Sequence, residues 1–315
     1  MEDSIELVVV HRRYLTPEIC QFDLRDPNGG TLPRFTAGSH IKVVTRSGDV
    51  RSYSLNNDEI EDHRYVISVK REEHGRGGSL GMHRDIREGD TIMVSAPKND
   101  LPLVPGSRYL LIAGGIGITP LLSMFRKLSR EGHEQVTLIY STRTSEDAAY
   151  LDELSNGPFA RNVILHHSHV GDNGNFDFWP YLRTPQDMHI YYCGPKPMMD
   201  AIYNQTIHWP RRLVHYEDFA GVSGVATGSA AFNVRRVSTG EIVEIPSDQT
   251  IVETFRARGL KPASSCESGT CGTCRVRLIS GEPDHRDLCL TEEERKDYFI
   301  PCVSRAVGNE ICLDM

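Results

Sequence analysis

The chain has 315 residues, 39% of them hydrophobic and 25% charged, which excludes a disordered tail or a fibre and suggests two or three domains. Its formal net charge of −8 argues against a nucleic-acid partner. No apolar run reaches the ~18–20 residues of a membrane helix, and the first residues lack the basic start of a signal peptide. Three of the eight cysteines crowd into residues 266–274, which favours metal binding in a reducing environment. We therefore expect a cytoplasmic protein that binds neither nucleic acid nor membrane.

The first hundred residues show short runs rich in Val, Ile, Tyr and Thr, separated by Gly, Asn, Asp and Pro. Several short strands divided by turn signals are typical of a small barrel or sandwich. The sequence predicts an antiparallel β-barrel domain over 1–105. Its expected strands are 5–10, 40–45, 50–55, 65–70 and 91–95.

After residue 105 short apolar strands alternate with helical runs. This order predicts an α/β domain over 106–219, in which a parallel sheet is covered by helices on both faces. The expected strands are 109–113, 135–141, 162–166 and 189–193. The expected helices are 120–132, 148–154, 176–182 and 196–208.

Residues 220–231 are small residues and valine, as in an interdomain linker. Short strands return after residue 232, with one helix and the cysteine cluster between them. The sequence predicts a third domain, of the α+β type, over 232–315. Its expected elements are strands at 232–237, 241–245, 274–280 and 310–313 and a helix near 251–258.

The strongest motif is Cys266, Cys271 and Cys274, spaced as C-x4-C-x2-C. This is the plant-type [2Fe–2S] spacing, which needs a fourth, distant cysteine. The glycines at 269 and 272 allow the loop to wrap tightly. A zinc site is the alternative, but zinc sites usually use two C-x2-C pairs, and only one is present here.

Two cysteines are candidates for the fourth ligand, Cys289 and Cys302. We choose Cys302, because the long return suits a separate strand beyond the acidic segment 291–297. Cys289 and Cys312 are then expected to be small buried side chains.

The second motif, GGIGITP over 114–120, follows a buried strand and precedes a helix. Glycines let a backbone approach a pyrophosphate, and a helix N-terminus attracts anions. Thr119 is expected to cap the helix and Pro120 to begin it. Cys193-Gly194-Pro195 ends another strand of the same sheet, where ligands of such sheets bind. A purely structural glycine turn is the alternative.

The third motif lies in the barrel. Strand alternation places Arg51 and Tyr53 on one face, where a guanidinium can pair with phosphate and a tyrosine ring can lie along a flavin. The turn Gly77-Gly78-Ser79 at a helix start is a second anion site. Together they predict a phosphate clamp, although each by itself also fits a solvated arginine or an ordinary loop.

These motifs, in this order and across essentially the whole chain, resemble the reductases of Rieske-type aromatic-ring oxygenases, typified by phthalate dioxygenase reductase and vanillate O-demethylase reductase. The resemblance implies bound FMN, a [2Fe–2S] cluster and NADH. It places Ser54, Thr119 and Cys193 at the reacting centre and Phe219 near the flavin. It assigns flavin binding to Arg51, Ser52, Tyr53, Ser54, Ser68, Val69, Lys70, Gly77, Gly78 and Ser79. It assigns nicotinamide binding to Gly115, Gly117, Thr119, Cys193 and Gly194, and iron binding to Cys266, Cys271, Cys274 and Cys302.

The implied activity is hydride transfer from NADH to FMN, followed by single-electron transfer through the cluster to a Rieske-type oxygenase. We expect a monomer. The alternatives are an FAD-containing reductase for a diiron monooxygenase, a free-standing diaphorase, and a zinc-bearing NAD-binding adaptor without turnover.

Two questions concern charged residues. Arg143 follows the second strand of the nucleotide domain, where an arginine could accept the 2′-phosphate of NADPH, although the resemblance favours NADH. Acidic residues near the cysteines either steer a basic partner or form an ordinary solvated face. They are Glu267, Asp284, Asp287, Glu292, Glu293, Glu294 and Asp297.

Overall fold

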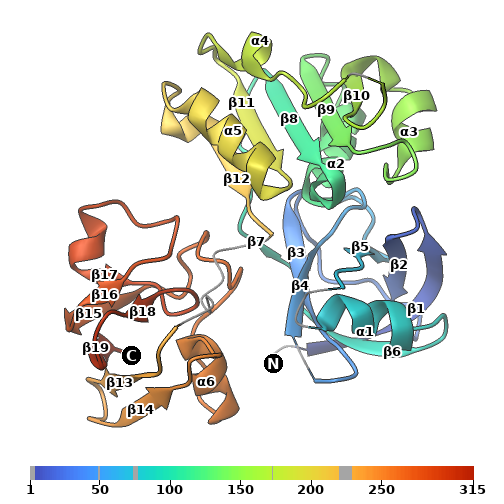
Figure 1. Cartoon of the computed structure of the whole chain (residues 1–315). Helices are drawn as coiled ribbons and strands as arrows, with labels where there is room; N and C mark the ends of the chain where they lie inside the picture. Colours follow the sequence, from blue (N-terminus) through green and yellow to red (C-terminus); the bar gives the residue numbers. More distant parts are fainter. Residues whose placement is uncertain (1–3, 49, 74–76, 172, 220–228) are drawn as a thin grey trace. The chain divides into compact units, whose positions relative to one another are not determined.

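A computed structural model describes residues 4–48, 50–73, 77–171, 173–219 and 229–315 (Figure 1). The chain forms two compact units, Met1–Glu217 and Asp218–Met315. Of the predicted linker, residues 220–228 lie outside the described residues. Within the described ranges, no helix has both the length and the apolar character needed to cross a bilayer.

The first sheet is antiparallel, as predicted, with strand order β4-β3-β6-β1-β2-β5 and β7 paired to β3. An antiparallel bridge between Leu55, just after β4, and Ile67 in β5 links the first and last strands of this order. The sheet therefore closes into a barrel around an apolar core. Helix α1 (Gly78–Asp85) contacts β5 through His83, whose Nε2 lies 2.8 Å from the Val69 carbonyl oxygen. The strands are β1 (Ser4–Tyr14), β2 (Ile19–Arg25), β3 (Ser39–Val44), β4 (Val50–Ser54), β5 (Tyr65–Lys70), β6 (Thr91–Ser95) and β7 (Lys98–Asn99).

Strand β2 was not among the predicted strands. Its sequence, ICQFDLR, alternates apolar and polar residues from Cys20 to Arg25, yet Asp23, at one of the polar positions, is only 5% exposed. Arg25 and Arg64 each place a guanidinium nitrogen 3.0 Å from the Asp23 carboxylate. Their charges compensate a buried carboxylate that the local pattern gave no reason to expect.

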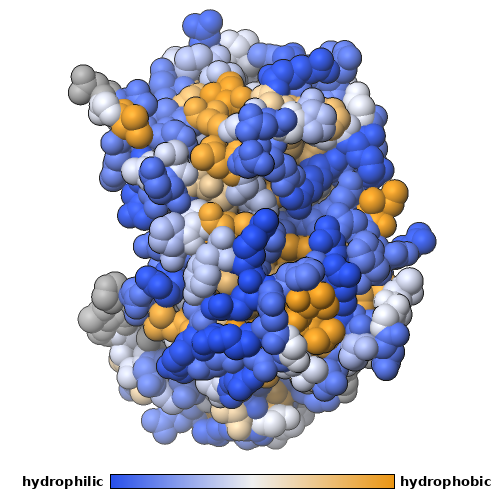
Figure 2. Space-filling view, turned by 90° about the vertical axis from the view of Figure 1, so that its right-hand side faces the viewer, coloured by the Kyte–Doolittle hydropathy of each residue, from blue (hydrophilic) through white to orange (hydrophobic). Residues whose placement is uncertain are grey.

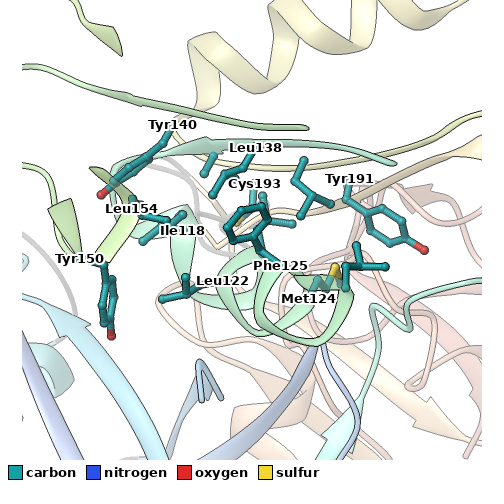
Figure 3. Packing of buried hydrophobic residues seen from close by; sticks show 14 of the residues in the cluster. Ile118, Leu122, Met124, Phe125, Leu138, Tyr140, Tyr150, Leu154, Tyr191 and Cys193 are labelled. Carbon is teal, nitrogen blue, oxygen red and sulfur yellow. The ribbon is translucent and has the colours of Figure 1, made fainter. Parts of the chain in front are cut away.

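The second sheet is parallel, as predicted, in the order β10-β9-β8-β11-β12. Successive side chains of its central strands point to opposite faces and build two apolar cores. Its strands are β8 (Tyr109–Gly114), β9 (Val136–Thr142), β10 (Val163–His167), β11 (His189–Cys193) and β12 (Val214–Glu217), the last not predicted. Its helices are α2 (Ile118–Arg130), α3 (Leu151–Asn156), α4 (Trp179–Leu182) and α5 (Lys196–Thr206), with 3-10 turns at Gly115–Gly117, Ala160–Asn162 and Arg211–Leu213. Figure 3 shows one of the two cores, in which side chains of α2 pack against those of β9 and β11.

Helix α2 also joins the barrel to the parallel sheet. Ser123 donates a hydrogen bond of 2.9 Å from Oγ to the Asn57 carbonyl, and Arg126 donates to the Asn56 carbonyl. Asn56 and Asn57 are both fully buried. This contact explains why residues 1–217 form one unit although two domains were predicted there.

The second unit contains a mixed sheet of order β14-β13-β19-β15-β17 and a two-stranded sheet, β16-β18. Helix α6 (Ile251–Ala257) begins with a capping box, in which Thr250 and Glu253 bond each other's backbone. The strands are β13 (Phe232–Arg236), β14 (Ile242–Ile245), β15 (Val276–Ser280), β16 (Pro283–Asp284), β17 (Tyr298–Phe299), β18 (Arg305–Ala306) and β19 (Glu310–Asp314), and a 3-10 turn spans Glu294–Lys296.

The face in Figure 2 is largely hydrophilic, with hydrophobic residues in small separate groups. Such scattered exposure is normal for a protein surface and by itself marks no interface.

A half-buried histidine pair predicts loss of stability in acid. His215 stacks on Tyr191 with ring centroids 4.4 Å apart, and its Nε2 lies 3.0 Å from Nδ1 of His189. Burial, and then the neighbouring His189, lowers the pKa of His215 from 6.5 to about 4. The unfolded chain therefore takes up this proton before the folded chain does. The stabilising contribution is complete above pH 6.5 and declines as the pH falls toward 4, by about 1–3 kcal/mol.

Urea unfolding of wild type and His215→Gln across this pH range measures the effect, with exposed His208→Gln as the control. We expect a flatter pH profile only in His215→Gln. Parallel profiles for wild type and His215→Gln would contradict the assignment.

Candidate cofactor sites

The barrel brings the two halves of the predicted phosphate clamp together. A Cβ added to Gly78 would lie 2.6 Å from both Cγ and Nε of Arg51, so the arginine side chain lies directly on this glycine. Gly77 precedes helix α1 with φ of 81°, in the left-handed region that glycine adopts readily. Ser79 Oγ accepts a hydrogen bond of 3.1 Å from the Glu72 backbone. A guanidinium beside a helix start is suited to a terminal phosphate.

The rest of the Arg51–Ser54 motif lies along β4. Ser52 is exposed, while Tyr53 packs against the barrel core, and its burial raises the pKa of the phenol to about 12. Ser54 is buried, and its Oγ lies 3.5 Å from Oε2 of Glu217 at the end of β12. This contact places the end of a barrel strand beside the carboxyl edge of the parallel sheet.

The predicted ring-bordering strand is the end of β5. Ser68 is buried, and its Oγ lies 2.6 Å from the Tyr150 hydroxyl and accepts a 3.2 Å hydrogen bond from Asn56. Lys70 Nζ lies 2.9 Å from Oε1 of Glu72. The motifs gave no signal for Tyr150. Its backbone is left-handed, with φ of 62°, which is uncommon for a residue other than glycine.

The two glycine motifs of the parallel sheet pack against each other. A Cβ on Gly117 would lie 2.2 Å from the Cys193 carbonyl oxygen and 2.8 Å from the Gly194 nitrogen. Gly194 in turn lies close to Gly114, because a Cβ added to Gly194 would be 3.0 Å from the Gly114 Cα. Gly115 has φ of 53° and open space around it. The turns after β8 and β11 therefore form one surface at the carboxyl edge of the sheet, where ligands of such sheets bind.

The capping prediction for this turn is wrong. Helix α2 begins at Ile118, preceded by Gly117, so neither Thr119 nor Pro120 has the predicted position. Thr119 is buried and donates a 3.0 Å hydrogen bond from Oγ1 to the Ile116 carbonyl. The short 3-10 turn Gly115–Gly117 leads directly into the helix, so the helix begins two residues earlier in the sequence than predicted.

The four predicted iron ligands lie in two pairs. Cys266 hydrogen-bonds with Cys271, and Cys274 with Cys302. Each contact lowers the pKa of one thiol, Cys266 or Cys274, and raises that of its partner. Among the described residues, no three His, Cys, Asp or Glu side chains converge on one ion position. Two thiol pairs fit a two-iron cluster better than one zinc ion.

Backbone geometry around these thiols is also suitable. The backbone nitrogens of Ser268 and Cys271 each lie 3.4 Å from Sγ of Cys266, as donors to a cluster ligand would. Gly269 has φ of 78°, and a Cβ there would lie 2.8 Å from Val303. The loop therefore needs glycine for both conformation and space.

Cys289 lies close to the same loop. Its Sγ would be 3.8 Å from a Cβ on Gly272, and it packs against the apolar cluster that includes Cys274 and Cys302. Burial raises its pKa to about 12. It is therefore close enough to require an experiment that distinguishes it from Cys302.

Basic partners accompany most of the acidic residues near the cluster. Asp287 is buried and accepts a 2.9 Å hydrogen bond from the Leu290 backbone. Five of the others are ion-paired, so their charges are partly neutralised, which favours the solvated-face interpretation over a strongly acidic docking patch. The ion pairs are Glu267–Arg256, Asp284–Arg286, Glu292–Arg295, Glu293–Lys296 and Glu294–Arg275.

Phe219 follows β12 and is 43% exposed. It falls in the second unit, Asp218–Met315, so its predicted place near the flavin stays a prediction.

Two family models match the chain. A 2Fe-2S iron-sulfur cluster binding domain covers residues 235–307, and an oxidoreductase NAD-binding domain covers residues 111–170. The first includes all four proposed ligands and the second includes the glycine turn.

The chain is similar to characterised reductases over nearly its full length. It is 42% identical to the phthalate 4,5-dioxygenase oxygenase reductase subunit of Pseudomonas putida, over 98% of this chain and 96% of that protein. It is 39% identical to vanillate O-demethylase oxidoreductase of Pseudomonas putida, over 99% and 100%. A solved structure of phthalate dioxygenase reductase superposes with a TM-score of 0.83 at 41% identity, covering 100% of this chain and 98% of that one.

Fold and sites together define a flavin- and iron–sulfur-containing pyridine-nucleotide reductase. The chain belongs to the family of phthalate dioxygenase reductase and vanillate O-demethylase reductase. It is an NADH-dependent oxidoreductase that uses FMN and a [2Fe–2S] cluster to supply electrons to an oxygenase. The cofactor predictions are confirmed, and the FAD, diaphorase and zinc-adaptor alternatives are not favoured.

Proposed function

We propose that this chain is the monomeric, cytoplasmic reductase of a Rieske-type aromatic-ring oxygenase or O-demethylase. The observations that support the proposal are, in one chain, an arginine packed on a glycine at a helix start and two thiol pairs within the residues that match a 2Fe-2S domain. Relatives named for phthalate dioxygenase and vanillate O-demethylase systems support the kind of partner. None of the eight cysteines, all of which lie in the described ranges, forms a disulfide with another, which supports a reducing compartment.

The bound flavin supplies the chemistry that accepts an electron pair from NADH and releases single electrons. The residues of the chain would hold and orient these groups. Arg51 and the Gly77–Ser79 turn would hold the phosphate end of FMN, and the end of β5 would contribute to the flavin site. Gly117, Cys193 and Gly194 would contribute the surface that receives the nicotinamide, and Thr119 is buried and supports the turn. Ser54, held near Glu217, lies where the two domains meet, so it is suited to position the flavin against the nicotinamide.

Four cysteines would hold the cluster as two ligand pairs. Cys266 and Cys271 would form one pair, and Cys274 and Cys302 the other. The backbone N–H groups of Ser268 and Cys271 stabilise negative charge on Sγ of Cys266, which would make a bound cluster easier to reduce.

Reduction of a purified Rieske-type oxygenase tests the function. The NADH-reduced protein is mixed anaerobically with the oxygenase component of a phthalate 4,5-dioxygenase system, and the Rieske centre is followed by paramagnetic resonance. We expect its reduction to be at least about tenfold faster than that of a generic dye at equal concentration, corresponding to about 1.4 kcal/mol. Equal rates would indicate a free-standing diaphorase. Light scattering tests the monomer, whose mass is 35.4 kDa.

Removal of the guanidinium from the phosphate clamp should weaken FMN binding. A charge-assisted hydrogen bond contributes about 1.5–3 kcal/mol, so Arg51→Ala should raise the Kd of FMN about 10–100-fold. Titration of the flavin-free protein by flavin fluorescence measures this effect. Arg46→Ala is the matched control, since Arg46 is an exposed barrel arginine paired with Asp90. The same Kd in wild type and Arg51→Ala would exclude the clamp.

A further inference from the structure

Arg143 lies at the nucleotide edge of the parallel sheet. It follows β9, the neighbour of β8, whose carboxyl end carries the glycine turn. Its guanidinium lies between two carboxylates, with Nη2 3.5 Å from Oε2 of Glu18 and Nε 3.4 Å from Oδ2 of Asp147. One arginine therefore faces two acidic partners.

The two carboxylates come from different parts of the first unit. Glu18 lies in the turn between β1 and β2 of the barrel, and its Oε2 is also 3.9 Å from Nζ of Lys70. Asp147 lies just beyond β9 and accepts a 3.3 Å hydrogen bond from Thr144. The barrel thus contributes a charge to the edge of the nucleotide domain.

All three side chains remain accessible. The side chains of Arg143, Glu18 and Asp147 are 56%, 40% and 31% exposed. Exposed ion pairs are individually weak, about 0–1 kcal/mol. A nucleotide phosphate at this edge could therefore reach the guanidinium, provided that it displaced or tolerated the carboxylates.

A 2′-phosphate at this edge distinguishes NADPH from NADH, and an arginine is the usual residue that accommodates it. Here the arginine is already paired, and an incoming dianion also meets two negative charges. We propose that Glu18 and Asp147 withhold Arg143 from a 2′-phosphate and so select NADH over NADPH. Such selection acts by penalising the wrong ligand rather than by improving the right one.

This inference rests on the nicotinamide-binding role of the domain and not on the identity of the oxygenase. A binding experiment therefore separates it from the proposed function, because no electron transfer is involved. The probes are adenosine 2′,5′-bisphosphate and 5′-AMP, which differ only in the 2′-phosphate.

Calorimetry on the full-length holoprotein gives the Kd of each probe, and the quantity compared is their ratio. In Glu18→Gln/Asp147→Asn we expect the ratio of the bisphosphate Kd to the 5′-AMP Kd to fall about tenfold, or about 1.4 kcal/mol. Each single variant should give part of this change. A parallel shift in kcat/KM for NADPH relative to NADH is expected from the same variants.

Two further variants make the result specific. Glu134→Gln makes the same charge change as either single variant, at an exposed site just before β9 and so at the opposite end of that strand, and should leave the ratio unchanged. Adding Arg143→Ala to the double variant should abolish the gain. A ratio within twofold of wild type in the double variant would overturn the proposal, as would a gain that persists without Arg143.

Discussion

Cys302→Ser is expected to lose the [2Fe–2S] cluster, whereas Cys289→Ser retains it. Cys302 is 3% exposed and hydrogen-bonds with Cys274, so it completes the second thiol pair. A serine hydroxyl is a poor substitute for the soft thiolate that iron–sulfur clusters require. We expect iron and labile sulfide in Cys302→Ser to fall at least about tenfold below wild type, because loss of a direct ligand should cost no less than the roughly tenfold that loss of an outer-shell partner costs.

The two variants should also differ in electron flow. In Cys302→Ser, reduction of the flavin by NADH persists, because that step takes place in the first unit. Reduction of an oxygenase or of cytochrome c, which requires the cluster, should be lost. Cys289→Ser serves as the matched control, since the same substitution is made next to the same loop. Cluster loss in Cys289→Ser alone would identify Cys289 as the ligand and reject Cys302.

Gly117→Ala should have the second largest effect, on hydride transfer from NADH. The added methyl would meet the Cys193 carbonyl oxygen at 2.2 Å, and this atom is backbone that no side-chain rotation relieves. Overpacking of this kind costs about 1–3 kcal/mol or more of folding free energy. The turns after β8 and β11 must move apart, and a displacement of ~1 Å in a substrate-positioning element lowers the rate about 100-fold.

Stopped-flow reduction of the flavin and thermal unfolding measure the two consequences of Gly117→Ala. The control is Gly132→Asn, just after the other end of helix α2. Gly132 has φ of 73° and no atom within 4 Å of an added Cβ, and asparagine tolerates this conformation better than most residues. We expect the control to lose less than about 1 kcal/mol and less than about tenfold in rate. Equal losses in both variants would contradict the claim that the close approach of Gly117 to the Cys193 carbonyl makes this glycine necessary.

Much of the fold was predictable from local patterns. The apolar strand at 109–113 and the cysteine spacing at 266–274 depend on periodicity and motif, and both predicted the correct domain class. Strand β2 was overlooked although Cys20–Arg25 alternates as a half-buried strand does; the burial of Asp23 could not be predicted locally, because the Arg64 that compensates it lies far along the chain. Strand β12 was missed because it is only four residues long.

The sequence by itself determined which cofactor chemistry this protein carries, because phosphate-binding glycines and cluster cysteines are required at fixed spacings along the chain. The tertiary structure alone decided which distant groups meet. Arg51 lies on Gly78, Gly117 packs on the Cys193 carbonyl, and Ser54 lies near Glu217. Likewise, Cys274 pairs with Cys302, and Arg143 forms ion pairs with Glu18 and Asp147. These contacts join groups that no local sequence pattern relates. The physical reason is that spacing constrains the backbone only within a turn or loop, whereas contacts between segments depend on how whole sheets and helices pack.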